Sequence, residues 1–131
     1  MKRLALALVL VALSGGAAAA WVRVGGSDYS NSYVDPATIR RTGDMVKMWS
    51  LLTYGAVQTS SSSGKQYMSS KLQWEYDCKN EQERRLYLSL YSGQMARWNV
   101  VHIESDPNSK WQPVPPGSAD ETLWKFACRK K

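Results

Sequence analysis

Apolar and polar side chains alternate most regularly between Lys71 and Cys78. Leu72, Trp74, Tyr76 and Cys78 occupy one side of this stretch, whereas the other side carries charged or amide groups. A period of two residues is typical of a β-strand that buries one face. The pattern therefore predicts a strand at the centre of a sheet, with its apolar face in the core.

Weaker strand patterns occur in five other segments, which are separated by turns rich in glycine, asparagine and charged residues. These predicted strands cover 21–24, 32–34, 45–54, 85–92 and 97–105. The serine-rich stretch 55–66 predicts a mobile hairpin loop before the central strand. Asp35 can cap a short helical turn, because its side chain can accept a backbone N–H and Pro36 suits the first helical position.

A helix is predicted at the C-terminus. Ser118 and Glu121 have the spacing of a capping box, and an apolar arc at helical spacing follows as far as Cys128. Strands followed by one helix predict an α+β fold, in which five or six strands form a twisted antiparallel sheet and the helix packs on one face. The helix is expected to cover the sheet face that carries Leu72, Trp74, Leu86 and Leu88.

The first 20 residues have the pattern of a secretory signal peptide. Two basic residues follow Met1, an apolar run covers 4–13, and small residues occupy 14–20. The apolar run is too short to span a bilayer, and no cysteine lies at the predicted cleavage site to carry a lipid anchor. We therefore expect cleavage after Ala20 and a single mature domain over 21–131.

Removal of the signal peptide would lower the net charge, and export would allow the two cysteines to form a disulfide. The formal net charge of +6 falls to +4 when Lys2 and Arg3 leave with the signal peptide. This mild excess fits acidic partners such as lipid headgroups, polyanionic sugars or acidic protein patches, although solubility alone is a sufficient explanation. Cys78 and Cys128 are the only cysteines, and two cysteines in an exported chain predict one disulfide.

The sequence offers few groups for catalysis. His102 is the only histidine, and a catalytic or zinc-binding role would need a nucleophile or further ligands beside it. Glu75 and Asp77 are better explained as ion-pairing residues on an exposed strand face than as an acid–base pair. The chain has no phosphate loop, nucleophile elbow or metalloprotease motif. We therefore predict a protein that is not an enzyme and has no catalytic residue, metal or cofactor.

The sheet face that the helix leaves open could bind a partner. It is predicted to carry Lys47, Trp49, Arg85, Tyr87 and Tyr91. Tyrosine, tryptophan and arginine are favoured at protein interfaces, and basic residues with aromatic ones can also bind single-stranded nucleic acid. An exported protein rarely meets nucleic acid, so we expect a protein partner here. A solvated face with an ordinary share of aromatic residues explains the same pattern equally well.

Several segments, in their order along the chain, resemble the surface-adhesin protein E family of exported proteobacterial proteins. They are WVRVG (21–25), YVDPATIRR (33–41), SSKLQWEYDCK (69–79), YSG (91–93) and WQPVPPGS (111–118). The resemblance covers nearly the whole mature chain. It implies a twisted antiparallel sheet with a C-terminal helix tied to it by one disulfide. The name of the family implies adhesion to host extracellular-matrix proteins.

Resemblance and composition together predict an exported binding protein in the periplasm or on the surface of a Gram-negative bacterium. Its expected partner is a protein, either a second copy of the chain or an extracellular-matrix protein. No transmembrane segment is expected in the mature form. The alternative function is that of a periplasmic inhibitor or accessory protein, because small disulfide-bonded β proteins often have such roles.

Processing after Ala20 is directly testable. N-terminal sequencing of the exported protein should give Trp21 as the first residue, because the tract 17–20 supplies the small side chains that signal peptidase selects. Recovery of an intact chain that starts at Met1 in the membrane fraction would contradict the prediction.

Overall fold

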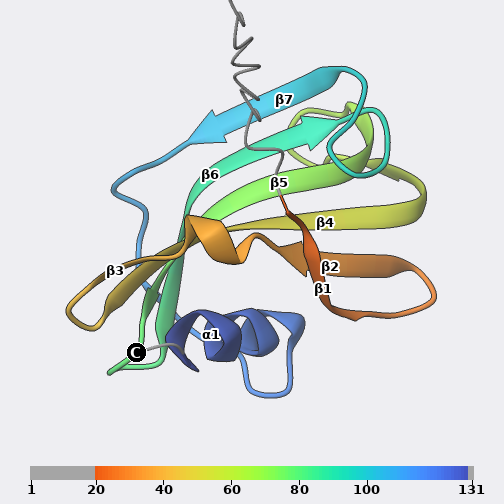
Figure 1. Cartoon of the computed structure of the whole chain (residues 1–131). Helices are drawn as coiled ribbons and strands as arrows, with labels where there is room; N and C mark the ends of the chain where they lie inside the picture. The colour runs from red at the N-terminus through yellow and green to blue at the C-terminus, as the bar shows by residue number, and fades with distance from the viewer. Residues whose placement is uncertain (1–19, 130–131) are drawn as a thin grey trace, which may run out of the picture.

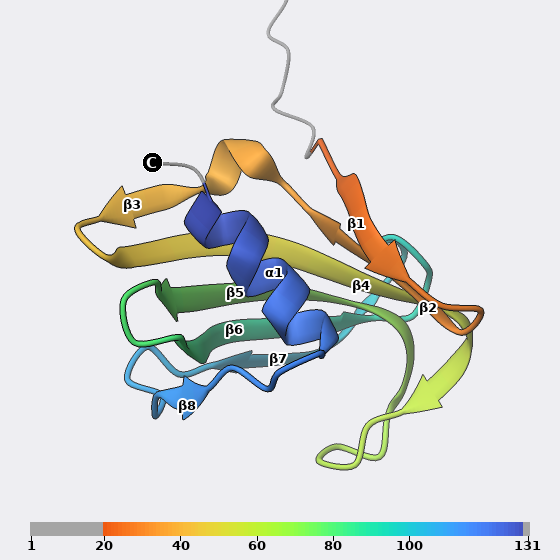
Figure 2. The same cartoon turned by 90° about the horizontal axis from the view of Figure 1, so that it is seen from below.

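The computed structural model describes residues 20–129 (Figure 1). The predicted signal peptide, apart from its last residue, lies outside the described residues, as do Lys130 and Lys131. The described chain forms one antiparallel sheet, and a single helix crosses one of its two faces. Figure 2, which views the molecule from the helix side, shows the helix lying across several strands.

The strands are β1 (Val22–Gly26), β2 (Ser30–Val34), β3 (Arg40–Thr42), β4 (Met45–Thr59), β5 (Gln66–Asp77), β6 (Gln82–Tyr91), β7 (Val100–Ser105) and β8 (Gln112–Pro113). A 3₁₀ turn, η1 (Pro36–Thr38), precedes β3, and the helix α1 (Ala119–Arg129) ends the described chain. Asp35 caps η1 as predicted, since its carboxylate accepts the Ala37 N–H at 3.1 Å.

The main path of the sheet runs β1-β2-β4-β5-β6-β7, with β3 beside β4 and β8 beside β6. The α+β layout is confirmed, but the sheet has eight strands and the prediction of five or six was wrong. The two missed strands, β3 and β8, are three and two residues long, too short to show a period of two. They extend the edges of β4 and β6 beyond the ends of β2 and β7.

Two predicted boundaries also differ from the structure. Half of the predicted loop over 55–66 is strand, because β4 continues to Thr59 and β5 begins at Gln66. Gln58 and Thr59 of β4 pair with Tyr67 and Gln66 of β5. Threonine and tyrosine suit a pleated surface, and the polar composition of this stretch concealed that preference. The predicted strand over 97–105 begins only at Val100, since the residues before it form a loop with left-handed backbone.

The core lies between the sheet and α1. Val46 and Met48 of β4, Tyr76 of β5 and Ala127 of α1 are fully buried there. Trp74 packs against the same cluster, so the alternation along β5 places its apolar face under the helix as predicted. Burying side chains of this size stabilises a fold by about 1.5–3 kcal/mol each, so this layer is the main attachment of α1.

The start of α1 is fixed by the predicted cap. The Ser118 Oγ accepts the Glu121 N–H at 3.1 Å and donates to the Pro115 carbonyl at 2.5 Å. Glu121 also pairs with Lys125 at 3.2 Å, one helical turn later. The bond to Ser118 satisfies one of the N–H groups that a helix terminus otherwise leaves open, so the helix begins where the proline-rich segment ends.

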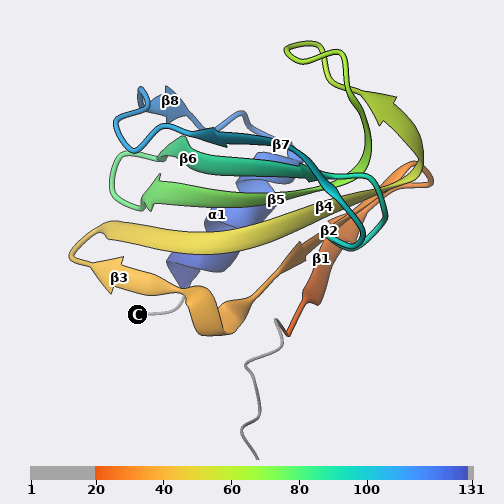
Figure 3. The same ribbon diagram turned by 90° about the horizontal axis from the view of Figure 1, so that it is seen from above.

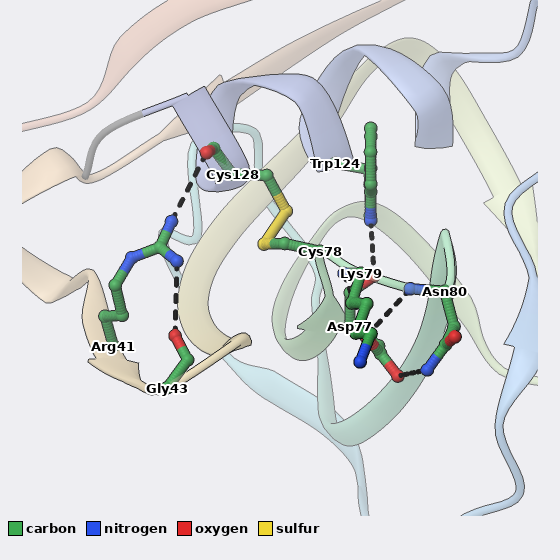
Figure 4. Close-up of a disulfide and its surroundings, with 8 residues drawn as sticks. All are labelled: Arg41, Gly43, Asp77, Cys78, Lys79, Asn80, Trp124 and Cys128. Atoms are coloured by element: carbon green, nitrogen blue, oxygen red, sulfur yellow. Dashed lines mark hydrogen bonds between the residues drawn. A yellow bond between two sulfur atoms is a disulfide. The ribbon is translucent and has the colours of Figure 1, made fainter.

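The end of α1 is tied to the sheet at a corner shown in Figure 4. Cys78 and Cys128 form the predicted disulfide, with their Cα atoms 5.6 Å apart and a sequence separation of 50. The Cys78 N–H donates to the Asp44 carbonyl at 2.9 Å, and the Arg41 guanidinium donates to the Cys128 carbonyl at 3.3 Å. The β3–β4 turn, the β5–β6 turn and the helix end therefore meet at one point.

Asp77 and Trp124 strengthen this corner. The Asp77 carboxylate accepts the Asn80 side-chain amide at 2.9 Å and the backbone N–H groups of Lys79 and Asn80 at 3.0 Å. The Asn80 side chain is the main reason that the pKa of Asp77 is lowered. The Trp124 indole donates to the Asp77 carbonyl at 3.1 Å, so the helix is hydrogen-bonded to the turn that carries Cys78.

The disulfide should contribute substantially to stability. Closing a loop of 50 residues stabilises a fold by about 4 kcal/mol in the chain-entropy model. Cys78→Ser and Cys128→Ser should each lose a similar free energy of unfolding in urea titrations, and the double variant should lose no more than either. Clearly additive losses would contradict a single bond as the common cause.

A buried carboxyl pair lies near the start of α1. Glu83 of β6 is only 3% exposed and pairs in register with Tyr76, beneath the helix. Burial raises the pKa of Glu83 to about 8, and the charge of Asp120 in the first turn of α1 and a hydrogen bond with it act in the same direction. Burial also raises the pKa of Tyr76 well above its usual value, with Glu83 and Asp120 as further causes. At neutral pH Glu83 therefore keeps its proton and donates a hydrogen bond to Asp120.

This pair predicts an unusual pH dependence. Between the ordinary glutamate pKa and about 8, the unfolded chain has lost the Glu83 proton and the folded chain retains it. The free energy of unfolding should therefore fall as pH rises through this window, by at most about 1.4 kcal/mol per pH unit from this group. Urea titrations from pH 5 to 8 should show Glu83→Gln gaining stability relative to the wild type as pH rises. The exposed Glu81→Gln is the control, and parallel pH profiles for wild type and Glu83→Gln would contradict the assignment.

Candidate binding site on the outer face of the sheet

The face of the sheet opposite α1, called the outer face here, carries four of the five predicted binding residues. Met48 points into the core, so its neighbours Lys47 and Trp49 point to the outer face. Trp49 lies in one cross-strand row with Gln73 and Tyr87, and the Trp49 and Tyr87 rings meet edge to face with centroids 5.3 Å apart. The fourth residue, Tyr91, accepts a hydrogen bond from Ser89 of the same strand face at 3.2 Å.

Arg85 does not share this face, and its predicted placement was wrong. A β-bulge in the β5–β6 pairing sets Arg85 opposite Trp74, whose ring packs under α1. Arg85 instead forms an ion pair with Glu104 of β7 at 3.2 Å. One extra residue in a strand reverses the side of every residue beyond it, and the strict alternation assumed for β6 could not allow for that.

The outer-face arginine is its neighbour Arg84, which the sequence reasoning did not select. Arg84 lies opposite Glu75, and their side chains form a hydrogen-bonded ion pair at 2.6 Å. The guanidinium also stacks over the Trp111 ring, 4.6 Å from its centroid. The charge of Arg84 is therefore neutralised by Glu75 within the protein. Its contact with the ring holds the segment around Trp111 against the sheet.

One half of the outer face is covered by the loop between β6 and β7, residues 92–99. The Ser69 Oγ donates to the Gly93 carbonyl at 2.5 Å and accepts the Ala96 N–H at 2.9 Å, while the Met95 N–H donates to Thr53 at 3.2 Å. Figure 3, which shows the outer face, displays this loop lying over the strands. The expectation that the whole face is open was therefore wrong. Tyr91, which pairs with Ser69, belongs to the covered half.

The uncovered half contains a groove of about 590 Å³ around Trp49. Its lining residues are Trp21, Asp35, Ala37, Thr38, Arg40, Trp49, Lys71 and Gln73. The 3₁₀ turn η1 forms one wall, because the chain crosses from β2 to β3 at this point and is fastened to the Trp49 backbone. The Trp49 N–H donates to the Thr38 Oγ1 at 3.0 Å, and the Trp49 carbonyl accepts the Asp35 N–H at 3.2 Å.

The groove is aromatic and cationic. The Lys71 ammonium lies 5.0 Å from the Trp49 ring centroid, a distance typical of a cation–π contact. Arg40 donates to the carbonyls of Ala37 and Ile39, which leave its positive charge uncompensated. The Asp35 carboxylate is 7% exposed and is engaged with the η1 backbone. The arrangement therefore suits contact with an acidic, partly apolar surface.

The residues considered for chemistry are engaged within the protein. Glu75 and Asp77 were expected on an exposed strand face, but they are only 8% and 4% exposed, because Glu75 pairs with Arg84 and Asp77 accepts from Asn80. His102 of β7 makes a 2.8 Å hydrogen bond with Glu104, which lowers the pKa of that carboxyl group. Within 20–129, no group of three histidine, cysteine or acidic side chains is placed to hold a metal ion. No helix in the same range is long and apolar enough to cross a membrane.

The sequence predicted that Lys47, Trp49 and Tyr87 lie on the outer face. It did not predict that Trp21, Arg40 and Lys71 line the groove beside Trp49. Lys71 could have been found, because it lies on the polar side of the best-defined strand and two residues before Gln73. Trp21 and Arg40 enter the groove through the paths of β1 and η1, which no local pattern specifies.

Comparison with known proteins gives the family. The model of the surface-adhesin protein E family matches residues 21–129, a range that includes every strand and the helix. The chain belongs to the surface-adhesin protein E family. The resemblance noted in the sequence is thereby confirmed. None of the curated proteins compared with the chain matches it.

Solved structures of Haemophilus influenzae protein E share the fold. One of them superposes with a TM-score of 0.59 at 12% identity, covering 84% of this chain and 86% of that one. Another gives a TM-score of 0.57 at 12% identity, covering 83% of this chain and 75% of that one. Identities this low show a common fold alone.

Proposed function

We propose that this protein is an exported, non-enzymatic adhesin of the cell envelope that binds a partner protein through the groove around Trp49. Membership of the surface-adhesin protein E family supports the adhesin-like role. The observation that carries the site is an aromatic, cationic groove on the half of the outer face that the loop 92–99 does not cover. Periplasm and cell surface are both compatible with this role.

The geometry favours tight contact at Trp49. Its backbone is hydrogen-bonded on both sides, to Thr38 and Asp35, and its ring is held between Lys71 and Tyr87. A side chain that is already ordered loses little conformational entropy on binding, so more of its contact energy appears as affinity. Aromatic anchors of this kind typically contribute about 2 kcal/mol or more when they become buried in an interface.

The charges favour an external acidic partner over a second copy of the chain. Lys47, Arg40 and Lys71 all lie on this face or beside the groove. Two copies facing each other through the groove would bring like charges together, which is unfavourable at an interface. An acidic patch on an extracellular-matrix protein would instead be attracted and steered towards the groove.

A second candidate is a periplasmic inhibitor or accessory protein that contacts its target through the loop 92–99. Trp98 is 84% exposed in this loop, and its backbone has a φ of 74°. Ser69 donates to the Gly93 carbonyl and accepts the Ala96 N–H, and Thr53 accepts the Met95 N–H, so the loop is held in place. A large aromatic side chain displayed on a constrained loop is a feature of proteins that insert one residue into a partner pocket.

Substitution in the groove tests the first candidate. Trp49→Ala and Tyr87→Ala should each weaken binding to a matrix protein at least tenfold in surface plasmon resonance, because the anchor area is lost. The panel should contain purified matrix proteins with acidic surfaces. Lys71→Glu should also reduce the salt dependence of association, because steering depends on that charge.

Two variants serve as matched controls. Tyr29→Ala removes an aromatic ring that is 82% exposed outside the groove and should leave binding unchanged. Trp98→Ala separates the two candidates, since it should affect only the loop-mediated function. If binding survives Trp49→Ala and Tyr87→Ala but is lost in Trp98→Ala, while circular dichroism stays native, the groove is not the binding site.

A further inference from the structure

Trp21, the first residue of the predicted mature chain, lines the groove around Trp49. β1 begins at the next residue, and the start of β1 lies beside η1 in Figures 1 and 3. Val22 pairs with Val34 of β2, so the same antiparallel register places Trp21 opposite Asp35. Residues that face each other across an antiparallel pair have Cα atoms about 4.5–5.5 Å apart and share one face of the sheet. Trp21 and Asp35 are therefore close neighbours in the groove.

The same register continues across the outer face. Val34 pairs with Ser50 of β4, which places Asp35 beside Trp49, and the Asp35 N–H donates to the Trp49 carbonyl at 3.2 Å. Asp35 thus lies between two tryptophans, Trp21 on one side and Trp49 on the other. Any charge gained by Trp21 therefore acts directly on the acidic residue of the groove.

Asp35 is a buried carboxylate without a counter-charge among residues 20–129. It is only 7% exposed, its side chain accepts the Ala37 N–H at 3.1 Å, and it takes part in none of the ion pairs of the described chain. A carboxylate has two oxygens and about four acceptor sites, so one hydrogen bond leaves most of its capacity unused. Buried charges in proteins are normally paired, so Asp35 is placed to accept a cation.

Signal-peptide cleavage would create that cation. Hydrolysis of the bond between Ala20 and Trp21 consumes one water: the Ala20 carbonyl carbon gains an oxygen and leaves as a carboxylate, and the Trp21 nitrogen becomes an ammonium group. The ordinary pKa of an α-amino group is about 8, so this group is mostly charged at neutral pH. The nitrogen is one bond from the Trp21 Cα, and the carboxyl carbon of Asp35 is two bonds from its own Cα. Across an antiparallel pair the two groups are therefore within reach of an ion pair.

We propose, resting on the proposed function of this groove and on the predicted cleavage after Ala20, that the new ammonium group of Trp21 pairs with Asp35 and completes the groove. Before cleavage, the charged lining consists of Arg40 and Lys71 against Asp35. After cleavage, the ammonium group neutralises Asp35, the one carboxylate among the lining residues of the described chain. Both basic side chains then remain for an acidic partner.

The ion pair would also fix the wall of the groove. Asp35 caps η1, and Thr38 of η1 accepts the Trp49 N–H at 3.0 Å. A cap that is held from a second side holds η1, and with it the backbone of Trp49. The chain would therefore reach its full affinity for an acidic partner only after processing, and the precursor would bind more weakly.

The test compares three forms of the mature protein that differ only at the Trp21 nitrogen. The first is unmodified, the second is Nα-acetylated and uncharged, and the third, the matched control, is Nα-dimethylated and still charged. Both modifications are made at mildly acidic pH, where the α-amine reacts before lysine because its pKa is lower. Acetylation should lower the melting temperature by about 3 °C or more, and dimethylation should leave it almost unchanged.

Asp35→Asn identifies the partner of the ammonium group. Asparagine removes the charge but keeps a side-chain oxygen that can cap η1. Acetylation should therefore change the melting temperature of this variant much less than that of the wild type. In the wild type, acetylation should also speed hydrogen exchange at the Thr38 and Trp49 amides, and it should leave exchange at the Cys78 amide unchanged.

Binding of poly-L-glutamate reports the charge of the groove. At low salt the unmodified and dimethylated proteins should bind it at least threefold more tightly than the acetylated protein, because the acetylated groove keeps the unpaired charge of Asp35. Lys110→Gln removes one exposed charge from the loop between β7 and β8, so it controls for net charge. This variant should lose less affinity than the acetylated protein does.

Three results would overturn the proposal. Equal melting temperatures of the acetylated and dimethylated proteins would show that the charge of the terminus forms no pair. An equal effect of acetylation on the wild type and on Asp35→Asn would show that the partner is another group. Equal losses of poly-L-glutamate binding in Lys110→Gln and in the acetylated protein would show that the terminus acts only through net charge.

The ion pair and the proposed function can fail separately. Acetylation should lower the melting temperature of Trp49→Ala as it does that of the wild type, because the pair does not involve the Trp49 ring. If Trp49→Ala loses matrix-protein binding but acetylation changes no melting temperature, only the ion pair is contradicted. If acetylation has its expected effect but Trp49→Ala still binds the matrix protein, only the proposed function is contradicted.

Discussion

The bond between Cys78 and Cys128 is the constraint on which the rest of the structure depends. The helix α1 has 11 residues, and helices of fewer than about 12–15 residues are marginal on their own in water. It persists because its apolar side chains are buried on Val46, Met48 and Tyr76, and because the disulfide holds its last turn at the sheet. A single helix attached in this way covers only one face. The other face must be closed by other means or left open.

Both outcomes occur on the outer face. The loop 92–99 closes one half through hydrogen bonds to Ser69 and Thr53, which lie on neighbouring strands. The other half stays open around Trp49, where η1 supplies a wall and Lys71 supplies charge.

The sequence predicted most of the elements that bury an apolar face. The structure confirms the alternation along 71–78 and the cap at Ser118, because each depends on residues close together in sequence. It also confirms the disulfide, because the chain has only two cysteines that could pair. The strand number was wrong because β3 and β8 are defined only by partners far away in sequence.

The binding site was only partly predictable. Lys47, Trp49 and Tyr87 lie on the outer face as predicted, since no bulge separates them from the core pattern. Arg85 was misplaced because the bulge lies at Leu86, between Arg85 and Tyr87, and no glycine or other local signal marks it in the sequence. The loop 92–99 also lacked a signal, since its left-handed positions are Met95, Ala96 and Trp98 rather than glycine.

Site-specific photo-crosslinking tests the central claim, that the open half of the outer face is where a partner protein binds. A photoreactive side chain would replace Gln73, on the floor of the groove, and in a second protein Asn108, in an exposed loop away from it. Each exported protein would be irradiated with the matrix protein that it binds, and the adducts would be mapped by mass spectrometry. The account predicts adducts from position 73 and none from position 108. Adducts from position 108 alone would contradict it.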